Sequence, residues 1–156
     1  MNKTIFYGIT VIAIFALIWI TYSARQHHSE ENGPVNTADA PQPIGPYSQA
    51  VLRGNALFIS GQVGLDPKTG IPDTADIATE TKRVMENITA ILAAAKMEMK
   101  DLTQVRIYLT DISNFKTVNE IYGSYFGKGP YPARETVEVS ELPKGMHIEI
   151  SATAIR

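Results

Sequence analysis

The chain begins with a stretch in which no side chain is charged, and this stretch divides the sequence into two unlike parts. From Thr4 to Ala24 every residue is neutral, and most are large and apolar. About 20 such residues are enough to cross a bilayer as a helix. No polar face interrupts the run, which argues against a helix packed on a globular core. We therefore predict a transmembrane anchor or a signal peptide at residues 1–24.

The residues at the two ends of this stretch predict its orientation. Lys3 precedes it, while Trp19 and Tyr22 lie near its far end, where aromatic side chains often meet the membrane surface. This pattern favours a head outside the cytoplasm, in the periplasm if the organism is bacterial. Cleavage near Ser23 or Ala24 would instead release a secreted or periplasmic head. The residues around these positions make a poor cleavage site, so we expect an uncleaved anchor.

A polar linker is predicted at residues 25–40, before a globular domain at 41–156. The linker is rich in Gln, Glu, Asn, Gly and Pro and has no apolar period. Its His27-His28 pair lacks further ligands at suitable spacing, so we expect no metal site. The chain has no cysteine, which excludes disulfides and thiolate metal sites. With 14 basic and 16 acidic residues and no basic stripe, it shows no electrostatic footprint for nucleic acid.

The globular part alternates strand-like and helix-like patterns. Apolar periodicity and turn signals predict its elements. They are strands at 50–53 and 56–60 joined by Gly54-Asn55, a helix at 76–95, a strand at 102–110, a helix at 111–126, and strands at 135–140 and 147–155. This order, β-β-α-β-α-β-β, predicts an α+β domain with a mixed sheet and two helices on one face. The other face of the sheet would then need other copies of the chain to cover it.

Several short motifs resemble those of one family, the reactive intermediate deaminases, which are also called Rid or YjgF-like proteins. The motifs cover essentially the whole globular part, in the order typical of that family. They are Ile44-Gly45-Pro46-Tyr47-Ser48-Gln49-Ala50, Ile59-Ser60-Gly61-Gln62, Tyr131-Pro132-Ala133-Arg134, Val137-Glu138-Val139, Leu142-Pro143 and Ile148-Glu149-Ile150. The resemblance does not extend to the N-terminal stretch, which typical members lack.

The resemblance implies a fold and an activity. The implied fold is the chorismate-mutase-like α+β fold, assembled as a homotrimer with clefts between subunits. The implied activity is hydrolysis of 2-imino or 2-enamino acids to 2-keto acids and ammonia, without metal or organic cofactor. Pyridoxal-phosphate-dependent dehydratases acting on serine or threonine produce such intermediates.

The resemblance also implies roles for particular residues. Arg134 would hold the substrate carboxylate, for which its planar guanidinium is suited, and two nearby prolines stiffen the backbone before it. Glu149 would lie near the imine carbon and position or activate water. Tyr47 is implied to be a third catalytic residue. Ser60, Gly61 and Asn119 are implied to line the same cleft and bind substrate. Thr136 stands where many members of the family have cysteine, which leaves the substrate preference open.

Each of these residues also has a purely structural explanation. Glu149 alternates with Ile148 and Ile150, so it would equally point into solvent from a regular strand. Tyr47 could lock a turn, Ser60-Gly61 could mark a β-bulge, and a helix surface could carry Asn119. The alternative function is a membrane-tethered module that binds keto or amino acids without catalysis. A nuclease ranks last, because the chain lacks a basic patch for phosphates.

Overall fold

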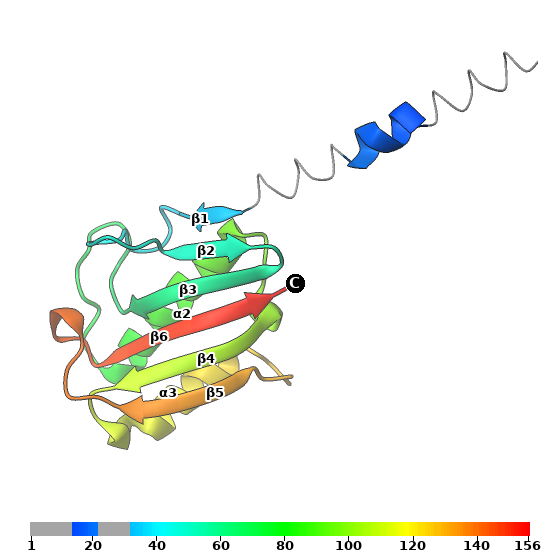
Figure 1. Cartoon of the computed structure of the whole chain (residues 1–156). Coiled ribbons are helices and arrows are strands. Elements are labelled where there is room, and N and C mark those ends of the chain that lie inside the picture. Colours follow the sequence, from blue (N-terminus) through cyan, green and yellow to red (C-terminus); the bar gives the residue numbers. More distant parts are fainter. Residues whose placement is uncertain (1–13, 22–31) are drawn as a thin grey trace, which may run out of the picture. The chain divides into compact units, whose positions relative to one another are not determined.

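The computed structural model describes residues 14–21 and 32–156 (Figure 1). The chain forms two compact units, residues 1–33 and residues 34–156, which we treat separately. In the first unit, residues 14–21 are helical.

The structure corrects the predicted localisation of the globular part. Within the described ranges 14–21 and 32–156, no helix combines the length and the apolar character needed to cross a membrane. The prediction of a head held outside the cytoplasm by a membrane anchor is therefore wrong. The rest of the predicted segment, at 4–13 and 22–24, lies outside the described residues, as does the His27-His28 pair.

The second unit is built on a six-stranded sheet with the strand order β1-β2-β3-β6-β4-β5. Strand β5 runs parallel to β4, while β2 pairs with β3, β3 with β6 and β6 with β4 in antiparallel fashion. The sheet is therefore mixed, as predicted. The strands are β1 Gly33–Val35, β2 Ala50–Arg53, β3 Ala56–Val63, β4 Leu102–Leu109, β5 Ala133–Glu138 and β6 Ile148–Ile155.

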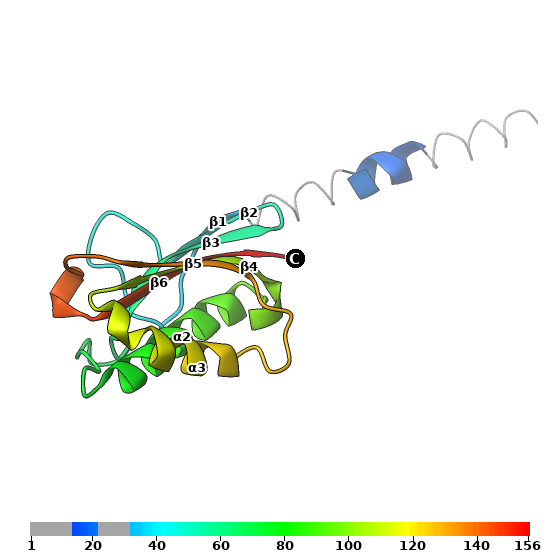
Figure 2. The same cartoon turned by 90° about the horizontal axis from the view of Figure 1, so that it is seen from below.

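Two helices, α2 (Ile77–Ala94) and α3 (Phe115–Ser124), cover one face of this sheet (Figure 2). Short 3-10 turns at Met99–Asp101, Ile112–Asn114 and Pro143–Gly145 connect the elements. The apolar side chains of α2 and of the covered face form one buried core. Apolar residues at helical spacing thus pack against apolar residues at strand spacing, which confirms the predicted α+β class.

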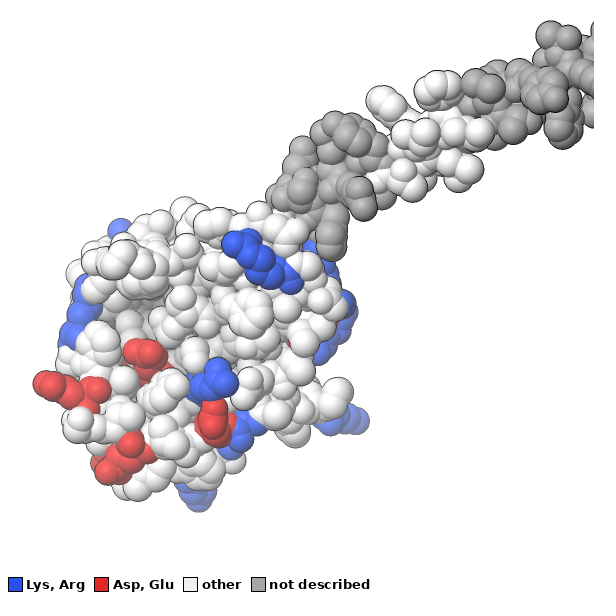
Figure 3. Space-filling model, viewed as in Figure 1, with Lys and Arg blue, Asp and Glu red and all other residues white. Residues whose placement is uncertain are grey.

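Within residues 34–156, no helix covers the other face of the sheet (Figure 1). Figure 3 shows that this face is largely uncharged, with isolated charged side chains. Phe58, Val137 and Ile155 on its strands are each between 44% and 50% exposed. One charged pair there joins Arg106 on β4 to Glu135 on β5, with Nε 2.6 Å from Oε1. We call this surface the open face.

Candidate functional site

Arg134 lies on the helix-covered side of the sheet. It belongs to strand β5, which begins at Ala133, two residues before the predicted start. Its partner on β4 is Val105, which is buried in the core. Paired residues on neighbouring strands point to the same face, so Arg134 points toward α3.

Two aromatic rings of α3 receive the Arg134 guanidinium. Its Cζ lies 4.8 Å from the centre of the Tyr122 ring and 5.7 Å from that of Phe115, both within the range of cation–π attraction. Tyr122 is 3% exposed, and its hydroxyl has no hydrogen-bond partner within the described residues. Burial raises the pKa of Tyr122 to about 12, with Arg134 opposing the rise. We call Tyr122 and Phe115 the aromatic cradle of Arg134.

The guanidinium itself remains available to a ligand. Among residues 14–21 and 32–156, no carboxylate forms an ion pair with Arg134. The cavity beside it has a volume of about 420 Å³ and is lined by Asn119, Tyr122, Gly123, Tyr131, Pro132 and Arg134. A planar anion entering this cavity would meet an oriented and unpaired arginine. We call it the arginine cavity.

Glu149 lies on the opposite side of the sheet. Its neighbours along β6, Ile148 and Ile150, are fully buried under the helices, so Glu149 alternates toward the open face. Burial raises the pKa of the Glu149 carboxyl above its ordinary value. Such a shift brings a carboxyl group closer to the neutral range in which a general base or acid works.

A bulge in β3 makes room for this carboxylate. The register between β3 and β6 shifts between Ile59 and Gln62, so Gly61 lies at the irregularity. A Cβ added to Gly61 would overlap Oε1 of Glu149 and would lie 2.6 Å from its Cδ. Only a glycine therefore lets the carboxylate lie against the β3 backbone. The sequence offered two explanations for Gly61, a β-bulge and a residue of the site. Both are compatible with this geometry.

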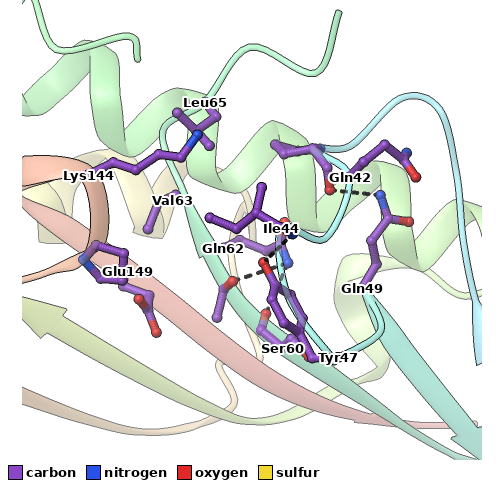
Figure 4. Close-up of a pocket in the computed structure, with 13 residues that line it drawn as sticks. Gln42, Ile44, Tyr47, Gln49, Ser60, Gln62, Val63, Leu65, Lys144 and Glu149 are labelled. Carbon is purple, nitrogen blue, oxygen red and sulfur yellow. Dashed lines mark hydrogen bonds between the residues drawn. The ribbon is translucent and has the colours of Figure 1, made fainter. Parts of the chain in front are cut away.

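Glu149 and Gly61 line a second cavity, of about 340 Å³, which we call the glutamate cavity (Figure 4). Tyr47 and Ser60 also line it, and the Ser60 hydroxyl donates to the Ser48 carbonyl at 2.7 Å. Its other lining residues are Pro41, Gln42, Ile44, Gln49, Gln62, Val63, Leu65, Pro143 and Lys144. Apolar side chains and the polar groups of Gln42, Gln49, Gln62 and Lys144 thus share the lining with Glu149.

The loop that walls this cavity is held by Gln49, which is 1% exposed. Its amide nitrogen donates to the carbonyls of Thr37, Ala40 and Pro41, and its amide oxygen accepts from the Thr37 backbone at 2.7 Å. A buried amide with all these bonds fixes the path of residues 37–41. Residues 37–40 of this segment lie inside the range predicted as linker, 25–40, and the boundary between linker and domain stays a prediction.

The six predicted site residues thus divide between two cavities. Tyr47, Ser60, Gly61 and Glu149 line the glutamate cavity, while Asn119 and Arg134 line the arginine cavity. Within one chain, the two groups lie on opposite faces of the sheet. A single copy therefore does not present Arg134 and Glu149 to the same small molecule.

The sequence did not single out several residues that shape the two cavities. Tyr122 and Phe115 lie in the predicted helix at 111–126, and helical spacing cannot reveal that they meet Arg134. Gln49 and Lys144 were not proposed at all. The position of Gln49 within the Ile44–Ala50 motif was the available signal. Thr136 lies two residues after Arg134, and its hydroxyl is buried without a partner inside the described part of the chain.

No side chains gather as a metal site in the two described ranges, where no group of three or more His, Asp or Glu residues lies close enough together to hold an ion. The ionisable groups of the two cavities are a carboxylate, a guanidinium, the Lys144 amine and tyrosine hydroxyls. These groups suit carboxylate binding and proton transfer to or from water.

Solved structures of known proteins share this fold. The YjgF gene product of E. coli is 39% identical with a TM-score of 0.76, over 79% of this chain and 98% of that one. E. coli TdcF with bound serine is 38% identical with the same TM-score, over 79% and 98%. The expected chorismate-mutase-like α+β fold is therefore confirmed.

Relatives of known sequence cover the same region. A RutC family protein of Pyrococcus horikoshii is 52% identical over 120 residues, which are 77% of this chain and 94% of the relative. The human 2-iminobutanoate/2-iminopropanoate deaminase is 46% identical over 122 residues, or 78% and 88%. The family model described as endoribonuclease L-PSP matches residues 37–156. With this match and these identities, the chain belongs to the L-PSP family, the family of the Rid and YjgF proteins.

Proposed function

We propose that this protein hydrolyses 2-imino and 2-enamino acids to 2-keto acids and ammonia, at a site assembled from two copies of the chain. One copy supplies the arginine cavity and the other supplies the glutamate cavity. The observation that carries the proposal is the placement of Arg134 and Glu149, both unpaired, on opposite faces of one sheet. Joint action on one small substrate then requires two subunits.

Arg134 binds the substrate carboxylate in this proposal. The aromatic cradle holds its guanidinium, and the planar fork pairs with both carboxylate oxygens. Asn119, on the same wall, can donate a further hydrogen bond. Orientation of the C=N carbon in this way makes attack by water effectively intramolecular.

Glu149 manages the protons. As a carboxylate it accepts a proton from the attacking water, and as an acid it returns that proton to nitrogen, so that ammonia leaves. Its raised pKa favours this exchange near neutral pH. The Tyr47 hydroxyl and the polar groups at Ser60 and Gly61 lie in the same cavity and can hold the water or the leaving ammonia. Water and two proton transfers complete the reaction, so the proposal needs no cofactor.

Related proteins support this substrate class. Human, bovine and rat relatives at 43% to 46% identity are named 2-iminobutanoate/2-iminopropanoate deaminases. A structural relative, E. coli TdcF, has bound serine, which carries a carboxylate next to a nitrogen-bearing carbon. The uncharged open face suits burial between copies, and we propose a homotrimer as the assembly.

A coupled assay tests the proposal. A threonine dehydratase generates the enamine and imine, and formation of the 2-keto acid is followed with and without this protein. We expect the wild type to accelerate formation and Arg134→Ala to raise KM by at least tenfold. Glu141→Gln, an exposed glutamate outside both cavities, is the control that keeps wild-type rates. Binding of a keto acid without any acceleration would contradict the enzyme and favour the non-catalytic binding module.

A further inference from the structure

A second glutamate, Glu80 on α2, lies completely buried beneath the sheet and takes no part in the proposed chemistry. It is 0% exposed, and burial of a carboxylate is unfavourable unless hydrogen bonds satisfy its oxygens. Among the described residues, the Glu80 side chain forms three hydrogen bonds, all with His147 and Ile148. The buried Glu80 carboxylate therefore binds one short segment of backbone.

That piece of backbone is the start of strand β6. Oε1 of Glu80 accepts from the His147 backbone N–H at 2.8 Å and from that of Ile148 at 3.1 Å. Oε2 lies 2.9 Å from Nδ1 of His147, which donates when it carries the proton. Glu149 is the next residue. The carboxylate of Glu80 thus fixes the two peptide groups that lead directly into the proposed general base.

The backbone just after the end of β3 lies close to Glu80. A Cβ on Gly64 would lie 2.5 Å from Cγ of Glu80 and 3.2 Å from Cε of Met146. In the same manner, the missing Cβ of Gly61, three residues earlier, leaves space for the Glu149 side chain. Gly61 in β3 and Gly64 just after its end therefore leave room for two glutamates, Glu149 at the glutamate cavity and Glu80 at the start of β6.

The turn just before this anchored backbone has an unfavourable conformation. Lys144, in the turn Pro143–Gly145, has φ 60° and ψ 21°, in the left-handed region that non-glycine residues rarely adopt. Pro143 and Lys144 line the glutamate cavity, and Met146, which follows the turn, is 1% exposed. Such conformations persist where the surrounding structure fixes them.

We propose that Glu80 is a positioning residue, which holds the start of β6 and the 143–147 turn so that the Glu149 carboxylate lies against Gly61. The inference rests on the proposed function, because the reaction of interest is the one that Glu149 would serve. It goes beyond that function in assigning a role to a residue that touches neither cavity. The loss of Glu80 would then alter the catalytic step and the titration of Glu149, in addition to any effect on folding.

Three substitutions in the full-length protein test this role. Glu80→Leu removes the acceptor, Glu80→Asp retracts the carboxylate by one methylene group, and Glu80→Gln keeps an oxygen that can accept both backbone bonds. The measurements are kcat and KM per folded protein, and the pKa of Glu149 by NMR titration of its carboxyl carbon. Thermal unfolding reports the folded fraction.

We expect Glu80→Leu and Glu80→Asp to lower kcat about tenfold or more while KM, set by Arg134, changes little. In both variants the pKa of Glu149 should move back toward the ordinary value for glutamate. Glu80→Gln should keep the wild-type kcat and titration. If Glu80→Leu does not fold, Glu80→Asp and Glu80→Gln decide the question.

Two results would overturn the role. One is a folded Glu80→Asp or Glu80→Leu protein that keeps the kcat and the Glu149 titration of the wild type while losing only stability. The other is a Glu80→Gln protein that is as impaired as Glu80→Asp. If the wild type itself has no activity, the proposed function fails, and the NMR titration alone still decides whether Glu80 positions Glu149.

Discussion

At the scale of single residues, Glu149 combines a catalytic position with an energetic cost. Its carboxylate lies against the β3 backbone without an ion pair among residues 14–21 and 32–156. Burial raises its pKa in the folded state, so the native protein binds a proton up to a higher pH than the unfolded chain does. The free energy of unfolding therefore falls as the pH rises through this window.

This linkage predicts that Glu149→Gln stabilises the protein at neutral pH. The amide has nearly the same shape but no charge to bury, so the variant should be more stable than the wild type above the folded-state pKa of Glu149. The difference should shrink to nothing as the pH falls below the ordinary glutamate value of about 4.5. Denaturant unfolding at pH 7 and pH 4 measures it. A Glu149→Gln variant less stable at pH 7 than the wild type would refute this prediction.

The aromatic cradle leads to a second prediction at this scale. Tyr122→Leu removes the ring that lies 4.8 Å from the Arg134 guanidinium, and a cation–π contact of about 1 to 2 kcal/mol corresponds to a KM roughly 5- to 30-fold higher. Tyr122→Phe keeps the ring and loses only a hydroxyl that has no partner in the described structure, so its KM should stay unchanged. Steady-state kinetics with the imine decide this, and equal KM values for the two variants would argue against the cradle.

The sequence predicted the proposed catalytic and binding residues better than the residues that hold them in position. Arg134 and Glu149 lie in motifs that resemble those of the family, so their candidacy was visible without a structure. Tyr122 looked like any inward-facing residue of an amphipathic helix. Its contact with Arg134 depends on how α3 packs against β5, which is a tertiary relation that residue spacing does not encode.

At the scale of secondary-structure elements, the bulge in β3 is the feature on which the site depends. Gly61 does not have a positive φ, so alanine is compatible with the backbone there and only the contact with Glu149 opposes it. Gly61→Ala should displace the carboxylate and lower kcat on the order of 100-fold, because a shift of about 1 Å costs that much.

A double-mutant cycle tests the cause of that loss. If Gly61→Ala acts through Glu149, then adding it to Glu149→Gln should lower kcat no further than Glu149→Gln alone. Thermal unfolding of each variant separates a catalytic loss from a folding defect. Additive losses in the double variant would show that Gly61 acts independently of the carboxylate.

The order and type of the elements of the globular part were predictable, while their ends were not. Apolar periodicity correctly placed α2, α3 and the strands from β2 to β6. Strand β5 begins at Ala133, inside the predicted loop, because pairing with β4 continues back to Gln104. Strand β1 was missed, since three residues are too few to show a period.

At the scale of the whole molecule, the sheet explains why the proposed active site needs two copies of the chain. One face is covered by α2 and α3, while the other is largely uncharged and bare. Arg134 belongs to the first face and Glu149 to the second. The need for a covered open face was visible in the sequence, because two helices cannot cover both sides of a sheet. The predicted localisation of the head was wrong: an uncharged run of residues does not by itself establish a spanning helix, and residues 14–21 and 32–156 contain no helix long and apolar enough to cross a membrane.

The central claim is that each active site takes Arg134 from one subunit and Glu149 from another. Arg134→Ala and Glu149→Gln proteins, each with strongly reduced activity alone, can be mixed in equal amounts, unfolded together and refolded. Random assembly leaves both native residues at about one quarter of the sites, so the account predicts recovery of about a quarter of the wild-type activity. A mixture that refolds into assemblies and stays inactive would contradict it.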